Sequence, residues 1–177
     1  MSNLQSMNAF EVIPKAVKVR EIVSVADMVV TRDPGTVLVT HALGSCLGVS
    51  VYDPVVQVGG LLHVMMPKSA INPVRAKEAP YTFVDTGLPM FLNELIGLGA
   101  DKERWIVKVC GGSQINGSED DRFSIGKKNY IMLRKVLWKN SVLIDAEDVG
   151  GTTPRTMSLD MDTGEVCVSV AGKKQYL

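Results

Sequence analysis

Short stretches rich in β-branched and aromatic residues, separated by turn-forming residues, recur along this chain from Val23 onward. Such stretches are typical of β-strands, because these side chains pack well on a pleated, half-buried surface. Turns are expected at Asp33-Pro34-Gly35, at Asp53-Pro54 and at Asp162-Thr163-Gly164, the last of which predicts a hairpin. Strands are therefore expected over residues 36–40, 47–52, 57–66, 105–109, 142–145, 155–159 and 165–170.

Two segments carry apolar residues at helical spacing. The apolar set of the first is Leu88, Phe91, Leu92, Leu95 and Ile96, and that of the second is Ile125, Met132, Leu133, Val136 and Leu137. Asp85 or Thr86 is expected to cap the first helix and Gly97 to end it, while Ser124 stands ahead of the second. Many strands and two main helices predict a layered α+β fold with mixed β-sheets.

The chain has 177 residues, a length that suits a single domain. Residues 1–21 mix proline, lysine and isolated apolar residues without a sustained period, and we interpret them as an N-terminal arm or an additional edge strand. Residues 22–177 contain no linker or internal repeat that would divide them. We therefore expect them to form one domain.

Charge and apolar patterning exclude some classes of partner. The 19 basic and 19 acidic residues give a net charge of zero, without the basic excess that nucleic-acid binding requires. The apolar runs are too short to span a bilayer, and no secretory signal is recognisable at the N-terminus, so membrane insertion and export are not expected. Three widely spaced cysteines, Cys46, Cys110 and Cys167, favour free thiols in a reducing cytoplasm.

Gly44-Ser45-Cys46 places two small residues directly before a cysteine, at the start of an expected strand. Glycine and serine permit a tight turn, and the alternation of Leu47, Val49 and Val51 puts Cys46 on the opposite, small and polar face. The backbone N–H groups of Ser45 and Cys46 are candidate donors to a developing oxyanion. Cys46 is thus a candidate nucleophile, and a small core residue is the alternative.

His63 lies in the next expected strand. If a hairpin pairs Pro54 with Val55, Cys46 lies opposite His63, where Cβ atoms are about 4.5–5.5 Å apart. An imidazole there favours the thiolate and can protonate a departing amine. Thr40, on the preceding strand, is a candidate acceptor for the other ring nitrogen. Ordinary structural roles for His63 and Thr40 are the alternative.

Three segments together resemble the chemoreceptor glutamine deamidase family, CheD: Leu43-Gly44-Ser45-Cys46, Tyr52-Asp53 and Gly59-Gly60-x-x-His63-x-x-x-Pro67. Further matching segments follow in order: Phe83-Val84-Asp85-Thr86, Lys108-Val109-Cys110-Gly111-Gly112, Ile125-Gly126-x-x-Asn129, Asp148-Val149-Gly150-Gly151, Arg155 and Thr163-Gly164. The resemblance covers roughly residues 22–172. It departs at Leu47-Gly48, Met66 and Cys110, none of which belongs to the candidate triad.

The resemblance implies a triad of Cys46, His63 and Thr40 and a layered α/β/β fold like that of bacterial toxin deamidases. It also implies that residues 22–177 form a single glutamine deamidase domain. The implied reaction is hydrolysis of glutamine side chains to glutamate and ammonia on the cytoplasmic helices of chemotaxis receptors, without cofactor or metal. A phosphatase partner of the CheC type and a cytoplasmic location are further implications.

Two other functions fit the same residues: another cysteine amidase or peptidase, or a non-catalytic regulator of a chemotaxis phosphatase. A zinc site is not expected, because the chain has no Cys-x-x-Cys or His-x-x-x-His pair. His41 is expected to point away from Thr40, in a surface or structural role. Asn129, on the apolar side of the second helix, is interpreted as a structural residue, with lining the site as the alternative.

Overall fold

The computed structural model describes residues 17–114 and 124–177. The strands are β1 (Val19–Ile22), β2 (Asp27–Thr31), β3 (Thr36–Leu43), β4 (Leu47–Asp53), β5 (Val58–Val64), β6 (Ile106–Gly111), β7 (Ala146–Val149), β8 (Arg155–Asp160), β9 (Val166–Val170) and β10 (Lys173–Tyr176). The α-helices are α1 (Pro73–Glu78), α2 (Val84–Gly97) and α3 (Ile125–Lys139). Short 3-10 helices are η1 (Ser69–Ile71), η2 (Pro80–Thr82) and η3 (Lys102–Arg104).

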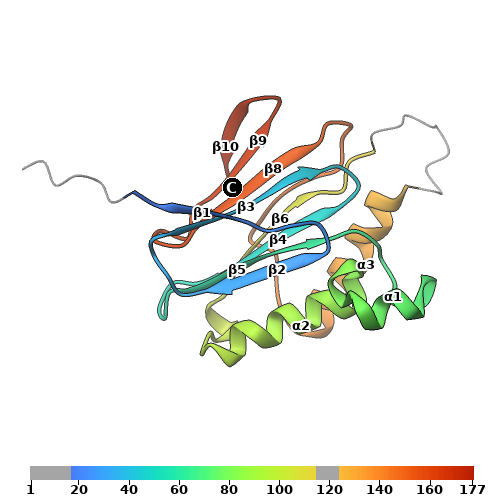
Figure 1. The fold of residues 1–177 in the computed structure, drawn as a ribbon, viewed down its shortest axis with the longest axis horizontal. Helices are drawn as coiled ribbons and strands as arrows, with labels where there is room; N and C mark the ends of the chain where they lie inside the picture. Colours follow the sequence, from blue (N-terminus) through green and yellow to red (C-terminus); the bar gives the residue numbers. More distant parts are fainter. Residues whose placement is uncertain (1–16, 115–123) are drawn as a thin grey trace, which may run out of the picture.

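The strands form two mixed five-stranded sheets (Figure 1). One sheet has the order β1-β3-β8-β9-β10, and the other has the order β2-β5-β4-β6-β7. The pairs β1–β3 and β6–β7 are parallel, and the other neighbouring strands are antiparallel. The predicted α+β class with two main helices is therefore confirmed.

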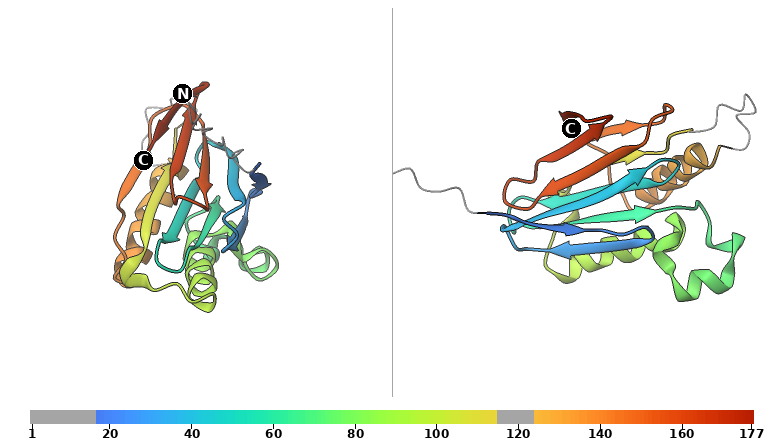
Figure 2. Two further views of the ribbon diagram at one scale, coloured as in Figure 1. Left: turned by 90° about the vertical axis from the view of Figure 1, so that its left-hand side faces the viewer. Right: turned by 45° about the horizontal axis from the view of Figure 1, so that its top comes forward.

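The molecule has three layers, with α2 and α3 on one face of the β4-containing sheet and the β3-containing sheet on its other face (Figures 1 and 2). Two hydrophobic clusters fill the spaces between the layers. The helix-side cluster includes Leu47, Val49 and Phe91, whereas the cluster between the sheets includes Leu43 and Met157. Strands β4 and β5 lie between the two clusters and are buried along their whole length.

Alternation in β4 sends its side chains into both clusters. Leu47, Val49 and Val51 pack toward the helices, and Tyr52 packs between the sheets. Gly48 also faces the second sheet, where a Cβ atom would lie 2.8 Å from Leu43 Cδ1. The large side chains thus hold the helices, while a glycine at position 48 leaves room between the sheets.

The expected strand over residues 142–145 is wrong, because the strand begins at Ala146, where β7 pairs in parallel with β6. The apolar residues that suggested a strand are used differently. Val142 is buried in the helix-side cluster, its N–H donating to Leu137 O at the end of α3, and Ile144 packs against the same cluster. The alternating apolar residues of this segment pack the connection between α3 and β7 against the helix-side cluster.

The ends of the two main helices agree only in part with the expectation. Ser124 caps α3 by accepting a hydrogen bond from Lys127 N–H, as its position ahead of the helix suggested. Asp85 and Thr86 do not cap α2, since Phe83 is the N-cap residue and makes no side-chain cap hydrogen bond. Asp85 instead accepts hydrogen bonds from Ser69 N–H and Oγ–H, which fastens η1 to the first turn of α2.

The expected arm over residues 1–21 lies mostly outside the described residues. Within its described part, Val19–Ile22 form the edge strand β1, which runs parallel to β3. The predicted hairpin at Asp162-Thr163-Gly164 is confirmed, because β8 and β9 pair across it and Gly164 has a positive φ of 72°. The edge strand and the hairpin both belong to the sheet that supplies Thr40.

Candidate active site

The turn between β3 and β4 carries Cys46 at its end. The register of β3 against β8 shifts between Thr40 and Leu43, and Ala42 takes a positive φ of 60°, so the chain leaves β3 through a bulge. Two backbone hydrogen bonds hold the turn: Gly112 N–H donates to Cys46 O at 2.8 Å and Ser113 N–H donates to Gly44 O at 2.7 Å. The turn is thus anchored to the chain that follows β6.

Gly111, at the end of β6, permits this close approach. A Cβ atom there would collide with Cys46 O, and its φ of 108° lies in a region that favours glycine. Arg155 braces the same segment by donating to Ser113 Oγ at 2.6 Å and to Asp148 at 2.8 Å. The backbone around Cys46 is therefore set by packed neighbours from distant parts of the chain.

A hydrogen bond between the two sheets joins Thr40 to His63. Thr40 Oγ1 lies 2.7 Å from His63 Nδ1 and 2.8 Å from Val23 O. The carbonyl oxygen can only accept, so the single hydroxyl proton goes to Val23 O and Thr40 must accept from Nδ1–H. This assigns the proton of neutral His63 to Nδ1 and leaves Nε2 as an acceptor. Nε2 is buried and has no hydrogen-bond partner within the described part of the chain.

The predicted pairing of Cys46 opposite His63 is wrong by two residues. Gly48 pairs with His63 and Leu47 with Val64, because the hairpin loop contains four residues, 54–57, and closes at Asp53 and Val58. Cys46 precedes β4 and packs against the cluster between the sheets. Cys46 is two residues before Gly48, and side chains two residues apart point to the same face of a strand. Cys46 is therefore a diagonal neighbour of His63, and diagonal neighbours on paired strands are about 7–8 Å apart.

Gly48 leaves space between the two sheets next to His63. It lies directly opposite His63, and a Cβ atom there would be 3.5 Å from Thr40 Cγ2. The absence of a side chain leaves the imidazole free to cross between the sheets to Thr40. The structure therefore brings Thr40 and His63 into direct contact and places Cys46 in the turn before β4, packed against the cluster between the sheets.

Burial opposes charge on both reacting groups. Desolvation lowers the pKa of His63 to about 4 and raises the pKa of the Cys46 thiol. At neutral pH the free protein therefore holds His63 as a neutral imidazole and Cys46 as a thiol. This arrangement suits general-base catalysis, in which the proton leaves the thiol as the sulfur attacks.

The turn residues proposed as oxyanion donors are placed as the sequence suggested, directly before β4. Within the described residues, the backbone N–H groups of Ser45 and Cys46 make no hydrogen bond to another residue. Both residues are partly exposed. The Cys46 N–H interacts with the thiol of the same residue, so both N–H groups stay candidate donors to an oxyanion that forms at this turn.

Comparison with known proteins identifies the family. The family model described as CheD chemotactic sensory transduction matches residues 65–170. A probable chemoreceptor glutamine deamidase CheD of Solibacter usitatus is 45% identical over 156 residues, which are 88% of this chain and 92% of that protein. The chain belongs to the CheD family. The probable chemoreceptor glutamine deamidase CheD 1 of Syntrophus aciditrophicus is 48% identical over 85% of this chain and 94% of its own length.

Similarity to CheD proteins extends to an archaeal source. A probable chemoreceptor glutamine deamidase CheD of Pyrococcus horikoshii is 41% identical over 81% of this chain and 88% of that protein. The family assignment suggested by the motifs around Cys46 and His63 is thus confirmed.

Asn129, for which lining the site was the alternative to a structural role, contacts the candidate site of this CheD chain. Asn129 is fully buried on α3, and its Nδ2 donates to Ser45 O at 2.9 Å and to Met65 O at 2.8 Å. It therefore contacts both the turn before Cys46 and the segment after His63. The signal that could have found it is a polar residue on the buried face of an amphipathic helix, since buried polar groups need partners.

His41 and the other two cysteines are not members of the candidate triad in this CheD chain. His41 is exposed, and its Nδ1 lies 3.4 Å from Thr156 Oγ1. Cys110 is fully buried, and burial raises its thiol pKa to about 12. Cys167 is partly buried on β9. Cys46 is a partly exposed thiol in the turn before β4, two residues from Gly48, the strand partner of His63.

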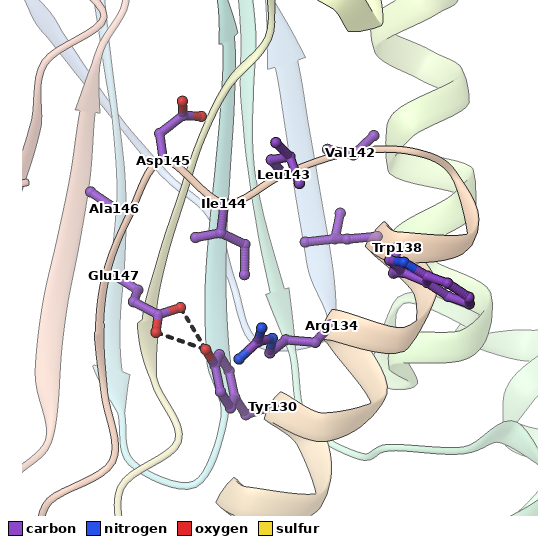
Figure 3. A pocket seen from close by; sticks show the side chains of 10 residues that line it. Tyr130, Arg134, Trp138, Val142, Leu143, Ile144, Asp145, Ala146 and Glu147 are labelled. Atoms are coloured by element: carbon purple, nitrogen blue, oxygen red, sulfur yellow. Dashed lines mark hydrogen bonds between the residues drawn. The ribbon is translucent and has the colours of Figure 1, made fainter.

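A cavity of about 560 Å³ lies between the C-terminal half of α3 and residues 142–147, and no triad residue lines it (Figure 3). Tyr130, whose hydroxyl donates to Glu147, and Trp138 are among the residues that line it (Figure 3).

Across residues 17–114 and 124–177, no group of three or more His, Cys, Asp or Glu could hold a metal ion. No helix of the described chain is long and apolar enough to cross a membrane.

Proposed function

We propose that this chain hydrolyses the side-chain amide of glutamine residues in the cytoplasmic helices of chemotaxis receptors, giving glutamate and ammonia. The observation that carries the proposal is the Thr40–His63 hydrogen bond, which leaves His63 Nε2 as a buried acceptor without a partner among the described residues. Cys46 lies two residues before Gly48, the strand partner of His63. The names of the relatives, probable chemoreceptor glutamine deamidases, supply the substrate class. The proposed place of action is the cytoplasm, where these receptor helices lie.

The first half of the reaction transfers the acyl group to the enzyme. Cys46 Sγ attacks the amide carbon while its proton moves to His63 Nε2, and the carbonyl oxygen becomes an oxyanion that accepts from the N–H groups of Ser45 and Cys46. The imidazolium then returns the proton to the amide nitrogen, the C–N bond breaks and ammonia leaves. Thr40 holds the ring by accepting from Nδ1–H throughout.

The second half restores the enzyme. Water attacks the thioester carbon and gives a proton to Nε2, the C–S bond breaks, and the proton passes to the Cys46 sulfur. The products are a glutamate side chain and a free thiol. No cofactor or metal takes part in the proposed cycle, because the nucleophile, base and oxyanion donors all come from the chain.

Intact-mass analysis of a receptor cytoplasmic fragment tests this function. Each deamidation adds about one mass unit without cleaving the chain, because an amide is replaced by an acid. Release of peptide fragments would identify a peptidase instead. An unchanged fragment mass, with free ammonia absent, would contradict the proposed activity and favour the reading of the chain as a non-catalytic regulator.

A phosphatase of the CheC type is the proposed partner. A receptor helix is about 10 Å wide, so the site must accept one protruding side chain from a cylinder, which calls for a shallow groove around Cys46. A partner helix without a cleavable glutamine would fit that groove as well. The partner is therefore expected to slow deamidation by competing with the receptor. Rates at rising partner and two receptor concentrations test this, and inhibition that extra receptor does not relieve would contradict a shared groove.

A further inference from the structure

The ladder between β4 and β5 ends at the site. Its last pair is Leu47 with Val64, and the next pair would join Cys46 to Met65. Met65 N–H donates instead to Thr82 O, and Cys46 O accepts from Gly112 N–H. The nucleophile turn and the segment after His63 are therefore no longer held together by backbone pairing at the point where their side chains must meet.

Asn129 bridges this gap with one amide group. Its Nδ2 donates to Ser45 O, the residue before the nucleophile, and to Met65 O, the second residue after the base. Both partners are carbonyl oxygens and can only accept, so the amide orientation is fixed and both of its N–H donors are used. The side chain replaces the missing ladder bond between the two strands.

The Asn129 bridge has an energetic cost, because it buries a polar atom that has no hydrogen-bond partner in the described part of the chain. Asn129 Oδ1 is buried and has no hydrogen-bond partner within the described residues. The neighbouring buried residues of α3, Leu133, Val136 and Leu137, are apolar. An apolar residue at position 129 would fill this layer without an orphaned acceptor. The need for two donors at this point explains why an amide stands there.

We propose that Asn129 is a positioning residue for the triad, which sets the separation of the Cys46 sulfur from His63 Nε2 by tying Ser45 to Met65. It acts through the backbone on both sides and transfers no proton. The proposal rests on the proposed function, because its kinetic readout is glutamine deamidation. A displacement of about 1 Å between reacting groups costs about 100-fold in rate, which is the size of effect expected when the bridge is lost.

The test is Asn129→Asp, which keeps the shape of the side chain and removes both N–H donors, so that a protonated carboxyl can donate to one of the two carbonyl oxygens at most. At a temperature where near-ultraviolet circular dichroism shows a folded protein, kcat should fall about 100-fold with KM little changed. Asn140→Asp is the matched control, since Asn140 lies at the end of the same helix and its Nδ2 donates only to Val136 O. The control should keep the wild-type kcat.

A second readout does not need the substrate. The alkylation rate of Cys46 against pH should lose its dependence on His63 in Asn129→Asp and match the profile of His63→Gln. Asn129→Ser, which is smaller and retains one donor, serves if Asn129→Asp does not fold, and should give an intermediate loss. A folded variant with wild-type kcat and a wild-type alkylation profile would show that Asn129 is only structural. If wild-type protein itself does not deamidate receptor, the proposed function fails, and the alkylation profile still decides the role of Asn129.

Discussion

His63 should make the stability of this protein depend on pH between about 7 and 4. An unfolded histidine has a pKa of about 6.5, whereas burial lowers that of folded His63 to about 4. Between these values the unfolded chain binds a proton that the folded protein excludes, so the free energy of unfolding falls as pH falls. Above the pKa of the unfolded histidine, His63 is neutral in both the folded and the unfolded protein, and its contribution to the pH dependence of the unfolding free energy vanishes.

The magnitude follows from the two pKa values. Lowering the pH from about 7.5 to about 5 should remove about 2 kcal/mol of unfolding free energy through this one residue. Urea unfolding at the two pH values measures it, and with a slope of about 2 kcal/mol per molar the midpoint difference is about 1 M. Because other groups also titrate, the quantity to compare is the pH dependence of wild type against that of a variant.

His63→Gln removes the titrating group, so its unfolding free energy should lose about 2 kcal/mol less than that of wild type over the same interval. His41→Gln is the matched control, since His41 is the other of the two histidines and is exposed. It should keep the wild-type dependence. Equal pH dependence in wild type and His63→Gln would refute the claim that the resting protein holds a buried neutral base.

Three further predictions concern single residues. Iodoacetamide should label Cys46 well before Cys110, because Cys110 is fully buried with a thiol pKa of about 12; peptide mapping with Cys110 labelled first would contradict this. Thr40→Val should lower kcat by about 10- to 100-fold by freeing the imidazole, and Thr40→Ser, which keeps the hydroxyl, should not; equal rates in steady-state assays would exclude the orienting role. Asp53→Ala should lower the unfolding free energy by about 2–3 kcal/mol in urea titrations, because the carboxylate is fully buried and accepts hydrogen bonds from Arg104 and from backbone N–H groups. These partners hold the pKa of Asp53 down at about 2. An unchanged urea midpoint would contradict this prediction.

The amino-acid sequence predicted the contact of Thr40 with His63 but not the strand register around them. Cys46, His63 and Thr40 were recognisable from their motifs, and Thr40 does contact His63. The strand register was not recognisable, because the hairpin loop closes with Gln57 at a positive φ of 51°, a conformation that a glutamine does not signal. A longer loop moved the partner of His63 from Cys46 to Gly48.

Packing between distant segments accounts for the remaining differences. Asn129 was visible as a polar residue on a buried helix face, but its partners lie 84 and 64 residues away, and local patterns do not identify them. Val142 and Ile144 resemble strand residues because they are buried, and only the packing of α3 shows that they belong to a connection. The α+β class follows from periodicity and the layer order was implied by the family resemblance, whereas register and side-chain bridges depend on tertiary contacts.

Deamidation of a receptor cytoplasmic fragment in heavy-oxygen water, followed by peptide mapping, tests the central claim most directly. Wild-type protein should place one water-derived oxygen on each modified glutamine, since water resolves the Cys46 thioester. Cys46→Ser and His63→Gln should place none at the same sites in the same time. Modification of the same glutamines by Cys46→Ser at the wild-type rate would contradict the assignment of Cys46 as the nucleophile.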